Sequence, residues 1–110
     1  MKDCSFSVDI GASQSILFTV FTDETDTARK NLTGCTLTAF IGASTPSITK
    51  LLRVVNAGDG TAALDLTPAE SRLVLLGQRM DVEIELREAG LQIVVGRGRV
   101  TGVGGINLDT

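Results

Sequence analysis

The stretch MDVEIELREAGLQIVV, Met80 to Val95, decides the fold class. Apolar and charged residues alternate in its first half, so an extended strand here has one apolar and one charged face. Such a strand packs its apolar face on a core and exposes the other face to water. Glu88-Ala89-Gly90 then provide a turn, and a returning strand completes a hairpin. The inward positions are predicted to be Met80, Val82, Ile84 and Leu86 on the first strand and Leu91, Ile93 and Val95 on the second.

Alternation with a period of two recurs along the chain, while helical periodicity is nearly absent. Clusters of Gly, Asp, Asn and Pro separate the alternating runs. Short strands at this spacing predict an all-β sandwich or barrel of Greek-key type with about seven strands. The remaining predicted strands are Ser5 to Ile10, Ser15 to Thr22, Thr36 to Ile41, Ile48 to Val55 and Thr61 to Leu66.

One segment, TPAESRLVLL from Thr67 to Leu76, departs from the β pattern. Thr67 is a good helix N-cap, Pro68 suits the first helical position, and Glu70 completes a capping box. We therefore predict one short helical turn between two strands, which gives Thr67 and Glu70 a structural role.

Length and composition indicate one domain spanning residues 1–110, with no linker or repeat. The chain has a mass of 11.5 kDa. Its 43% hydrophobic and 21% charged residues are typical of ordinary globular proteins. No apolar run approaches the roughly 20 residues that span a bilayer, and no secretory signal is visible, so we expect synthesis in the cytoplasm and no membrane partner. The glycosylation pattern at Asn31 is then unused, and Cys4 and Cys35 are expected to be reduced and buried.

The absence of His, Trp and Tyr limits the possible functions. Without histidine the chain lacks the usual base for a Ser or Cys nucleophile and the commonest metal ligand. Only four phenylalanines offer rings for a sugar or an unstacked base. With a net charge of -3 and no basic stripe, nucleic acid is not an expected partner. We predict no catalytic residue, no cofactor and no metal.

The motif VVGRGRVTG, Val94 to Gly102, superficially resembles a phosphate-binding loop. Its glycines are spaced one residue too far apart for the dinucleotide fingerprint, and no helix follows to present its N-terminus to a phosphate. A β-bulge near Gly96 or Gly98 explains the motif better, because strict alternation would drive Arg97 and Arg99 into the core. The bulge turns both arginines outward and Val100 inward.

Two groups of acidic residues are candidate sites. Asp81, Glu83 and Glu85 share the outward face of one strand and are interpreted as a solvated charge ladder paired with Arg97 and Arg99, although a glycosidase pair or a cation site are sharper alternatives. The cluster Asp23, Glu24 and Asp26 lacks the spacing of a calcium loop and is interpreted as a hydrated hairpin tip.

Three blocks in order, NLTGCTLTAF, GDGTAALDLTPAES and QRMDVEIELREAGLQIVVGRGRVTG, resemble the small immunoglobulin-like domain of tailed-phage virion proteins. Leu32-Thr33-Gly34 match the family's Asp-Leu-Thr-Gly start of a strand, with Asn31 in place of Asp. Thr67 and Glu70 match its helical turn. Asp81-Val82-Glu83 match its Tyr-Asp-Leu-Glu-Leu strand, with Met80 in place of Tyr. The resemblance implies an immunoglobulin-like antiparallel β-sandwich in which Cys35, Leu37, Ala39 and Ile41 point inward.

The resemblance also implies a function. It predicts a non-enzymatic structural protein of a tailed bacteriophage, made in the host cytoplasm and built into the virion in several copies beside other phage structural proteins. The expected place is the tail or baseplate, linking a fibre or spike to the tail body. The alternatives are a capsid decoration protein and, less favoured, a small carbohydrate-binding module.

The Gly-rich segment of residues 102–110 is predicted to be a tail outside the folded domain. Its apolar residues would lie along a partner chain, as extended peptides do on sheet edges. Partner-binding residues are therefore predicted to be Val103, Ile106 and Leu108.

Overall fold

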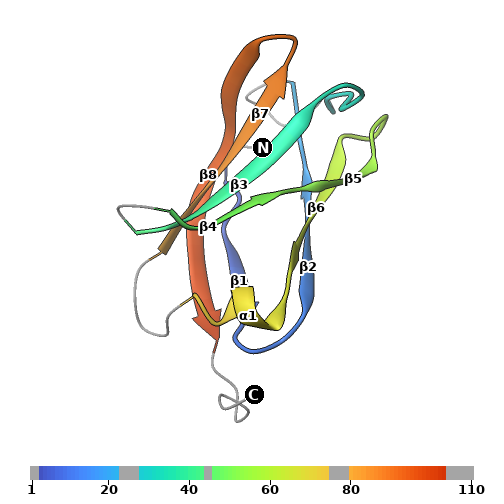
Figure 1. Cartoon of the computed structure of the whole chain (residues 1–110). Helices are drawn as coiled ribbons and strands as arrows, with labels where there is room; N and C mark the ends of the chain where they lie inside the picture. The colour runs from blue at the N-terminus through green and yellow to red at the C-terminus, as the bar shows by residue number, and fades with distance from the viewer. Residues whose placement is uncertain (1–2, 23–27, 44–45, 75–79, 104–110) are drawn as a thin grey trace.

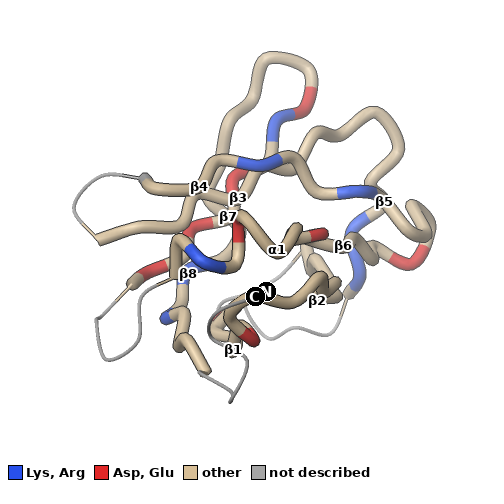
Figure 2. Tube along the Cα trace, turned by 60° about the horizontal axis from the view of Figure 1, so that its bottom comes forward, with Lys and Arg blue, Asp and Glu red and all other residues tan. Residues whose placement is uncertain are grey.

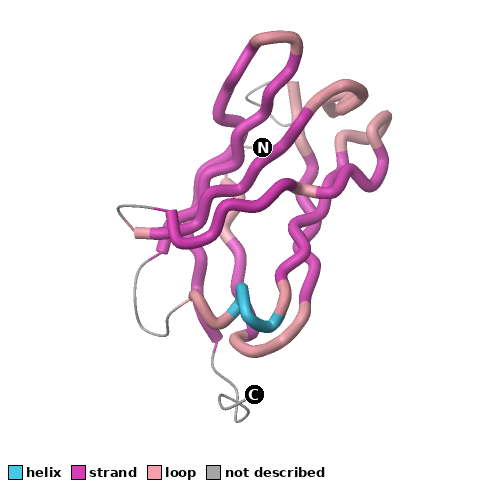
Figure 3. Tube along the Cα trace, in the orientation of Figure 1, coloured by secondary structure: helices cyan, strands magenta, loops and turns pink. Residues whose placement is uncertain are grey.

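The computed structural model describes residues 3–22, 28–43, 46–74 and 80–103, which form two β-sheets and one helical turn (Figure 1, Figure 3). The acidic cluster at Asp23, Glu24 and Asp26 lies outside the described residues. The strands are β1 (Phe6–Asp9), β2 (Gln14–Thr19), β3 (Thr36–Gly42), β4 (Pro46–Leu51), β5 (Arg53–Asn56), β6 (Thr61–Leu66), β7 (Met80–Glu88) and β8 (Leu91–Val103), and the helical turn α1 is Pro68–Ser71.

The larger sheet has the strand order β1-β8-β7-β3-β4, and the smaller has the order β2-β6-β5. Every pairing is antiparallel except that of β1 with β8, where Phe6 lies beside Val100 and Asp9 beside Val103. The prediction of a purely antiparallel arrangement is therefore wrong for the larger sheet, which is mixed. Side-chain alternation is the same in parallel and antiparallel strands, so the sequence pattern carries no information about strand direction.

The predicted strand Ile48 to Val55 is two strands, which raises the number from about seven to eight among the described residues. The chain leaves the larger sheet after β4 and enters the smaller sheet as β5. At the crossing, Leu52 is buried in the core and its amide donates to the carbonyl oxygen of Leu37 at 2.9 Å. The buried side chain and this backbone hydrogen bond hold the crossing in place.

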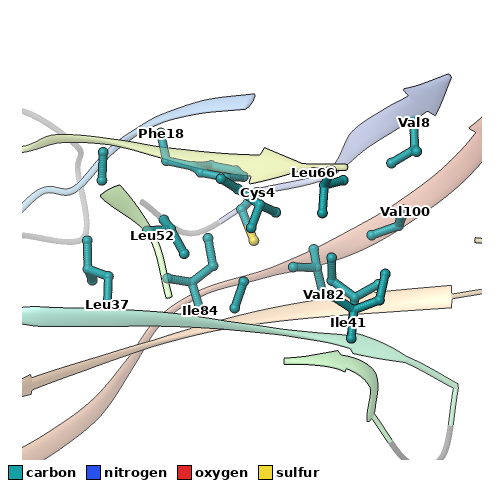
Figure 4. Close-up of a cluster of buried hydrophobic side chains, with 14 of the residues drawn as sticks. Cys4, Val8, Phe18, Leu37, Ile41, Leu52, Leu66, Val82, Ile84 and Val100 are labelled. Carbon is teal, nitrogen blue, oxygen red and sulfur yellow. The ribbon is translucent and has the colours of Figure 1, made fainter. Parts of the chain in front are cut away.

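The core lies between the two sheets (Figure 4). Phe18 and Leu66 of the smaller sheet face Ile41 and Ile84 of the larger sheet. The predicted inward row of β7 is confirmed, since Met80, Val82, Ile84 and Leu86 are all buried. The row on β3 is confirmed at Leu37, Ala39 and Ile41, while Cys35 before it is only partly buried.

The predicted bulge in β8 is confirmed. Ile84 pairs with Gly96 and Glu85 with Val94, so Val95 is an extra residue without an opposite partner on β7. As a result Arg97 and Arg99 are exposed. Val100 is buried in the core, as the bulge requires.

The predicted capping box at α1 and the predicted turn before β3 are also confirmed. The Thr67 hydroxyl accepts a hydrogen bond from the Glu70 amide at 3.1 Å, and the Glu70 carboxylate accepts one from the Thr67 amide at 2.9 Å, with Pro68 in the first turn. Before β3, the Asn31 side-chain oxygen accepts from the Thr33 amide at 2.9 Å, and Gly34 has a φ of 77°. The segment around Asn31 is thus the turn that starts β3.

Gly98 permits the close approach of the N-terminal segment to β8. A Cβ atom at this position would lie 2.4 Å from the Ser5 amide nitrogen and 2.8 Å from the Cys4 carbonyl carbon, both backbone atoms. The Ser5 hydroxyl accepts from the Arg99 amide at 2.8 Å, and the Cys4 amide donates to the Arg97 carbonyl oxygen at 3.2 Å. Any side chain at residue 98 would disturb these contacts.

We predict that Gly98→Ala destabilises the fold by about 1–3 kcal/mol, because the added methyl group must displace backbone rather than a flexible side chain. Gly58→Ala is the matched control, since a Cβ there meets only the Asn56 side chain at 3.6 Å. Urea unfolding of both variants measures the difference. Equal stabilities would contradict the role assigned to Gly98.

We predict that Ile84→Asp lowers the free energy of unfolding by several kcal/mol out of the roughly 5 to 15 kcal/mol typical of a domain, because it buries an unpaired carboxylate. The Ile84 side chain is fully buried. Glu83→Ala, on the outward face of the same strand, should cost at most about 1 kcal/mol, since only an exposed ion pair is lost. Similar losses in thermal unfolding of the two variants would reject the strand register.

Candidate functional site

The described residues offer no metal centre: within residues 3–22, 28–43, 46–74 and 80–103, no group of three or more His, Cys, Asp or Glu side chains could hold an ion. In the same ranges, none of the helical structure is both long and apolar enough to cross a membrane.

The outer face of the larger sheet carries the predicted charge ladder, and Figure 2 marks the acidic and basic residues along the chain trace. The same face has a hollow of about 960 Å³. Arg97 Nε lies 3.2 Å from Glu83 Oε2, and Arg99 is opposite Asp81 in the register. Glu85 Oε1 accepts hydrogen bonds from Gln92 at 2.6 Å and Arg87 at 3.3 Å. The predicted pairing is thus confirmed for Glu83 with Arg97, whereas Glu85 bonds to Arg87 and Gln92 rather than to Arg97 or Arg99.

A second polar cluster lies on the smaller sheet. Asp65 accepts a hydrogen bond from the Ser15 hydroxyl at 2.5 Å and two from the Arg53 guanidinium at 3.0 and 3.2 Å. The guanidinium and the hydroxyl lower the pKa of Asp65 to about 2. A carboxyl group with this low a pKa is a weak general base, which argues against activation of Ser15 as a nucleophile.

The β7–β8 hairpin extends past the end of the smaller sheet (Figure 1). Opposite residues share a face, so Ile93 lies on the core side with Leu86, and Leu91 with Glu88. The predicted inward orientation of Leu91 and Ile93 is therefore confirmed, but neither residue is buried: their exposed fractions are 58% and 42%. Both point to the core side, but the opposing sheet does not reach them.

The same part of β8 has an open backbone edge. On the side away from β7, β1 pairs with β8 only from Val100 to Val103, and a single bridge joins Asp3 to Arg97. No strand of the described chain lies beside Leu91–Val95 on that side. We call this open-edged, partly apolar segment, residues Leu91–Val95, the hairpin overhang.

A polar cluster lies near the tip of the β7–β8 hairpin, where Glu88 is opposite Leu91. The Cys35 thiol donates to Glu88 Oε2 at 3.1 Å, and Lys30 Nζ lies 2.8 Å from the same oxygen. The Lys30 ammonium and the thiol lower the pKa of Glu88, while desolvation and the bond to Glu88 raise the pKa of Cys35. The arrangement keeps Cys35 protonated at neutral pH, the opposite of what a nucleophilic cysteine needs.

Of the three predicted partner-binding residues, the structure describes Val103 alone. Val103 is the last residue of β8 and is 44% exposed. Its carbonyl oxygen accepts from the Ile10 amide at 3.1 Å, and Gly102 pairs with Val8. The tail predicted to begin at residue 102 therefore begins no earlier than residue 104, because two of its residues complete the parallel pairing with β1. Ile106 and Leu108 lie outside the described residues.

The sequence did not indicate the hairpin overhang, because Leu91 and Ile93 alternate as core residues do. The only available signal was their position directly after the turn Ala89-Gly90, at the tip of a hairpin. Compared with protein-family models and with curated proteins, the sequence gives no match.

Both cysteines are free, and we predict that both react slowly with a thiol reagent in the native protein. Burial raises the pKa of Cys4 to about 11, and only 3% of this residue is exposed, so Cys4 should react only when the chain opens. Cys35 should be the faster of the two, with a rate that rises with pH as thiolate forms. Time courses of thiol labelling at neutral pH, on the native protein, on unfolded protein and on Cys35→Ser, measure these reaction rates. Two fast native thiols would contradict it.

Proposed function

We propose that this chain is a non-enzymatic docking module of a tailed-phage virion, with its place in the tail or baseplate. The observation that carries the docking role is the hairpin overhang, where exposed Leu91 and Ile93 lie beside an open strand edge. An edge of this kind is completed by another polypeptide rather than by a small substrate.

The finer, immunoglobulin-like assignment is supported by the strand order. In variable-type immunoglobulin domains one sheet contains strands G, F, C and C′, and the B, E and D strands belong to the other sheet. The order β8-β7-β3-β4 corresponds to the first set and β2-β6-β5 to the second. β1 departs from the A strand of constant-type domains, because it pairs with β8 rather than β2.

The phage part of the proposal is supported by the resemblance in sequence, whose motifs coincide with folding features. Asn31 makes the turn before β3, and Thr67 and Glu70 form the capping box between β6 and β7. Asp81-Val82-Glu83 lie in the central part of the larger sheet, on β7. These positions are structural, so the resemblance supports a common architecture more strongly than a common partner.

The alternative functions predict different stoichiometries. A tail or baseplate component occurs in a few to a few tens of copies per particle, whereas a capsid decoration protein occurs in hundreds. A carbohydrate-binding module would use the outer hollow, which is lined by two half-buried phenylalanines, Phe6 and Phe40, beside Glu83 and Arg97. The Phe6 ring already packs edge-on against Phe18, and two half-buried rings among charged side chains are a poor sugar platform.

We predict that purified phage particles of the source contain this protein at tail stoichiometry. Quantitative mass spectrometry gives the copy number, and electron microscopy of labelled particles gives the place. Hundreds of copies on the shell would assign it to the capsid instead. Its absence from particles would reject the virion role, and glycan binding by the isolated domain would favour the carbohydrate-binding module.

A further inference from the structure

We propose that the hairpin overhang of one copy binds residues 104–110 of a second copy as an added β-strand, so that copies associate head to tail. The inference rests on the proposed docking function and identifies its partner as another copy of this chain. It joins the open edge of β8, which no strand of the described chain covers, with the apolar residues that the sequence places beyond Val103.

The hairpin overhang, which we call the acceptor segment, has the features that the addition of a β-strand requires. An extended peptide added to a sheet edge gains backbone hydrogen bonds, and its alternate side chains provide specificity. On the core side of the hairpin overhang, Leu91 and Ile93 are two residues apart and are 58% and 42% exposed. A strand beside them would extend the five-stranded sheet and place its own core-side residues against both.

Residues 104–110, which we call the donor segment, have an apolar pattern that matches that of the hairpin overhang. In GGINLDT, residues 104–110, Ile106 and Leu108 are also two residues apart, with polar Asn107 and Asp109 at the alternate positions. In an extended strand both apolar side chains fall on one face, about 7 Å apart, which is the spacing of Leu91 and Ile93. The two glycines before them allow the chain to change direction after β8.

The donor cannot bind its own acceptor. Leu108 follows Val103 by five residues, so it lies at most about 18 Å from it. Leu91 and Val103 are the two ends of a 13-residue strand, about 40 Å apart at the usual rise, in a molecule 42 Å long. Figure 1 shows the β7–β8 turn and the end of β8 at opposite ends of the domain. The contact must therefore join two copies through different surfaces, which gives a ring or an open chain.

The test uses two purified variants of the chain, each defective in one surface. A chain that ends at Val103 keeps the acceptor and the whole of β8. The full-length double variant Leu91→Lys, Ile93→Lys keeps the donor. In sedimentation velocity at near-millimolar concentration, the unaltered chain should form species larger than one chain, and each variant alone should stay monomeric.

The decisive sample is the equimolar mixture of the two variants. It should form dimers and nothing larger, because only one donor and one acceptor remain. Leu17→Lys is the matched control, because Leu17 is 68% exposed on the smaller sheet and outside the hairpin overhang. It should associate like the unaltered chain. Melting curves of all variants establish that each is folded.

Three results would overturn the proposal: a monomeric unaltered chain, self-association of the chain that ends at Val103, or a mixture that stays monomeric. A monomeric chain that is nonetheless present in particles would reject head-to-tail association and leave the docking function standing. If the protein associates head to tail but is absent from particles, the virion function is rejected and the head-to-tail contact stands.

Discussion

The extra residue at Val95 is the constraint on which the rest of the structure depends. It shifts the phase of β8, so that Gly96, Gly98 and Val100 lie opposite the inward residues of β7 while Arg97 and Arg99 face solvent. Without the shift, two guanidinium groups would enter the core at a large desolvation cost. Because β7 is central in the larger sheet, its register with β8 sets both the core and the charged outer face.

The bulge also divides β8 into two parts with different neighbours. The part after it is covered: β1 runs parallel to residues Val100–Val103, and Gly98 lets the N-terminal segment come into backbone contact. The part before it carries apolar residues on the core side but extends past the smaller sheet and has an open edge. One strand therefore closes the domain at one end and leaves exposed apolar residues beside an open edge at the other.

Three carboxylates of the described chain, Glu70, Glu88 and Asp65, are engaged in contacts that hold the fold. Glu70 caps α1 and lies 2.6 Å from Lys50 Nζ, Glu88 binds Lys30 and Cys35, and Asp65 binds Arg53 and Ser15. Carboxylates held this way remain ionised and paired, which suits a scaffold. Docking through the hairpin overhang uses backbone edge and apolar area instead, so it needs no group that these pairs already employ.

The sequence by itself determined the features that depend on near neighbours along the chain. The alternation of apolar and polar residues predicted the strands and the inward row of β7. Thr67 and Glu70 predicted the capping box, Asn31 predicted the turn before β3, and the glycine motif predicted the bulge. Only the tertiary structure decided how far each face is covered. The break at Leu52, the parallel direction of β1 and the exposure of Leu91 and Ile93 all depend on where a strand from elsewhere in the chain lies or ends. An apolar residue carries the same local signal whether the opposing sheet reaches it or stops short, so the candidate site became visible only in three dimensions.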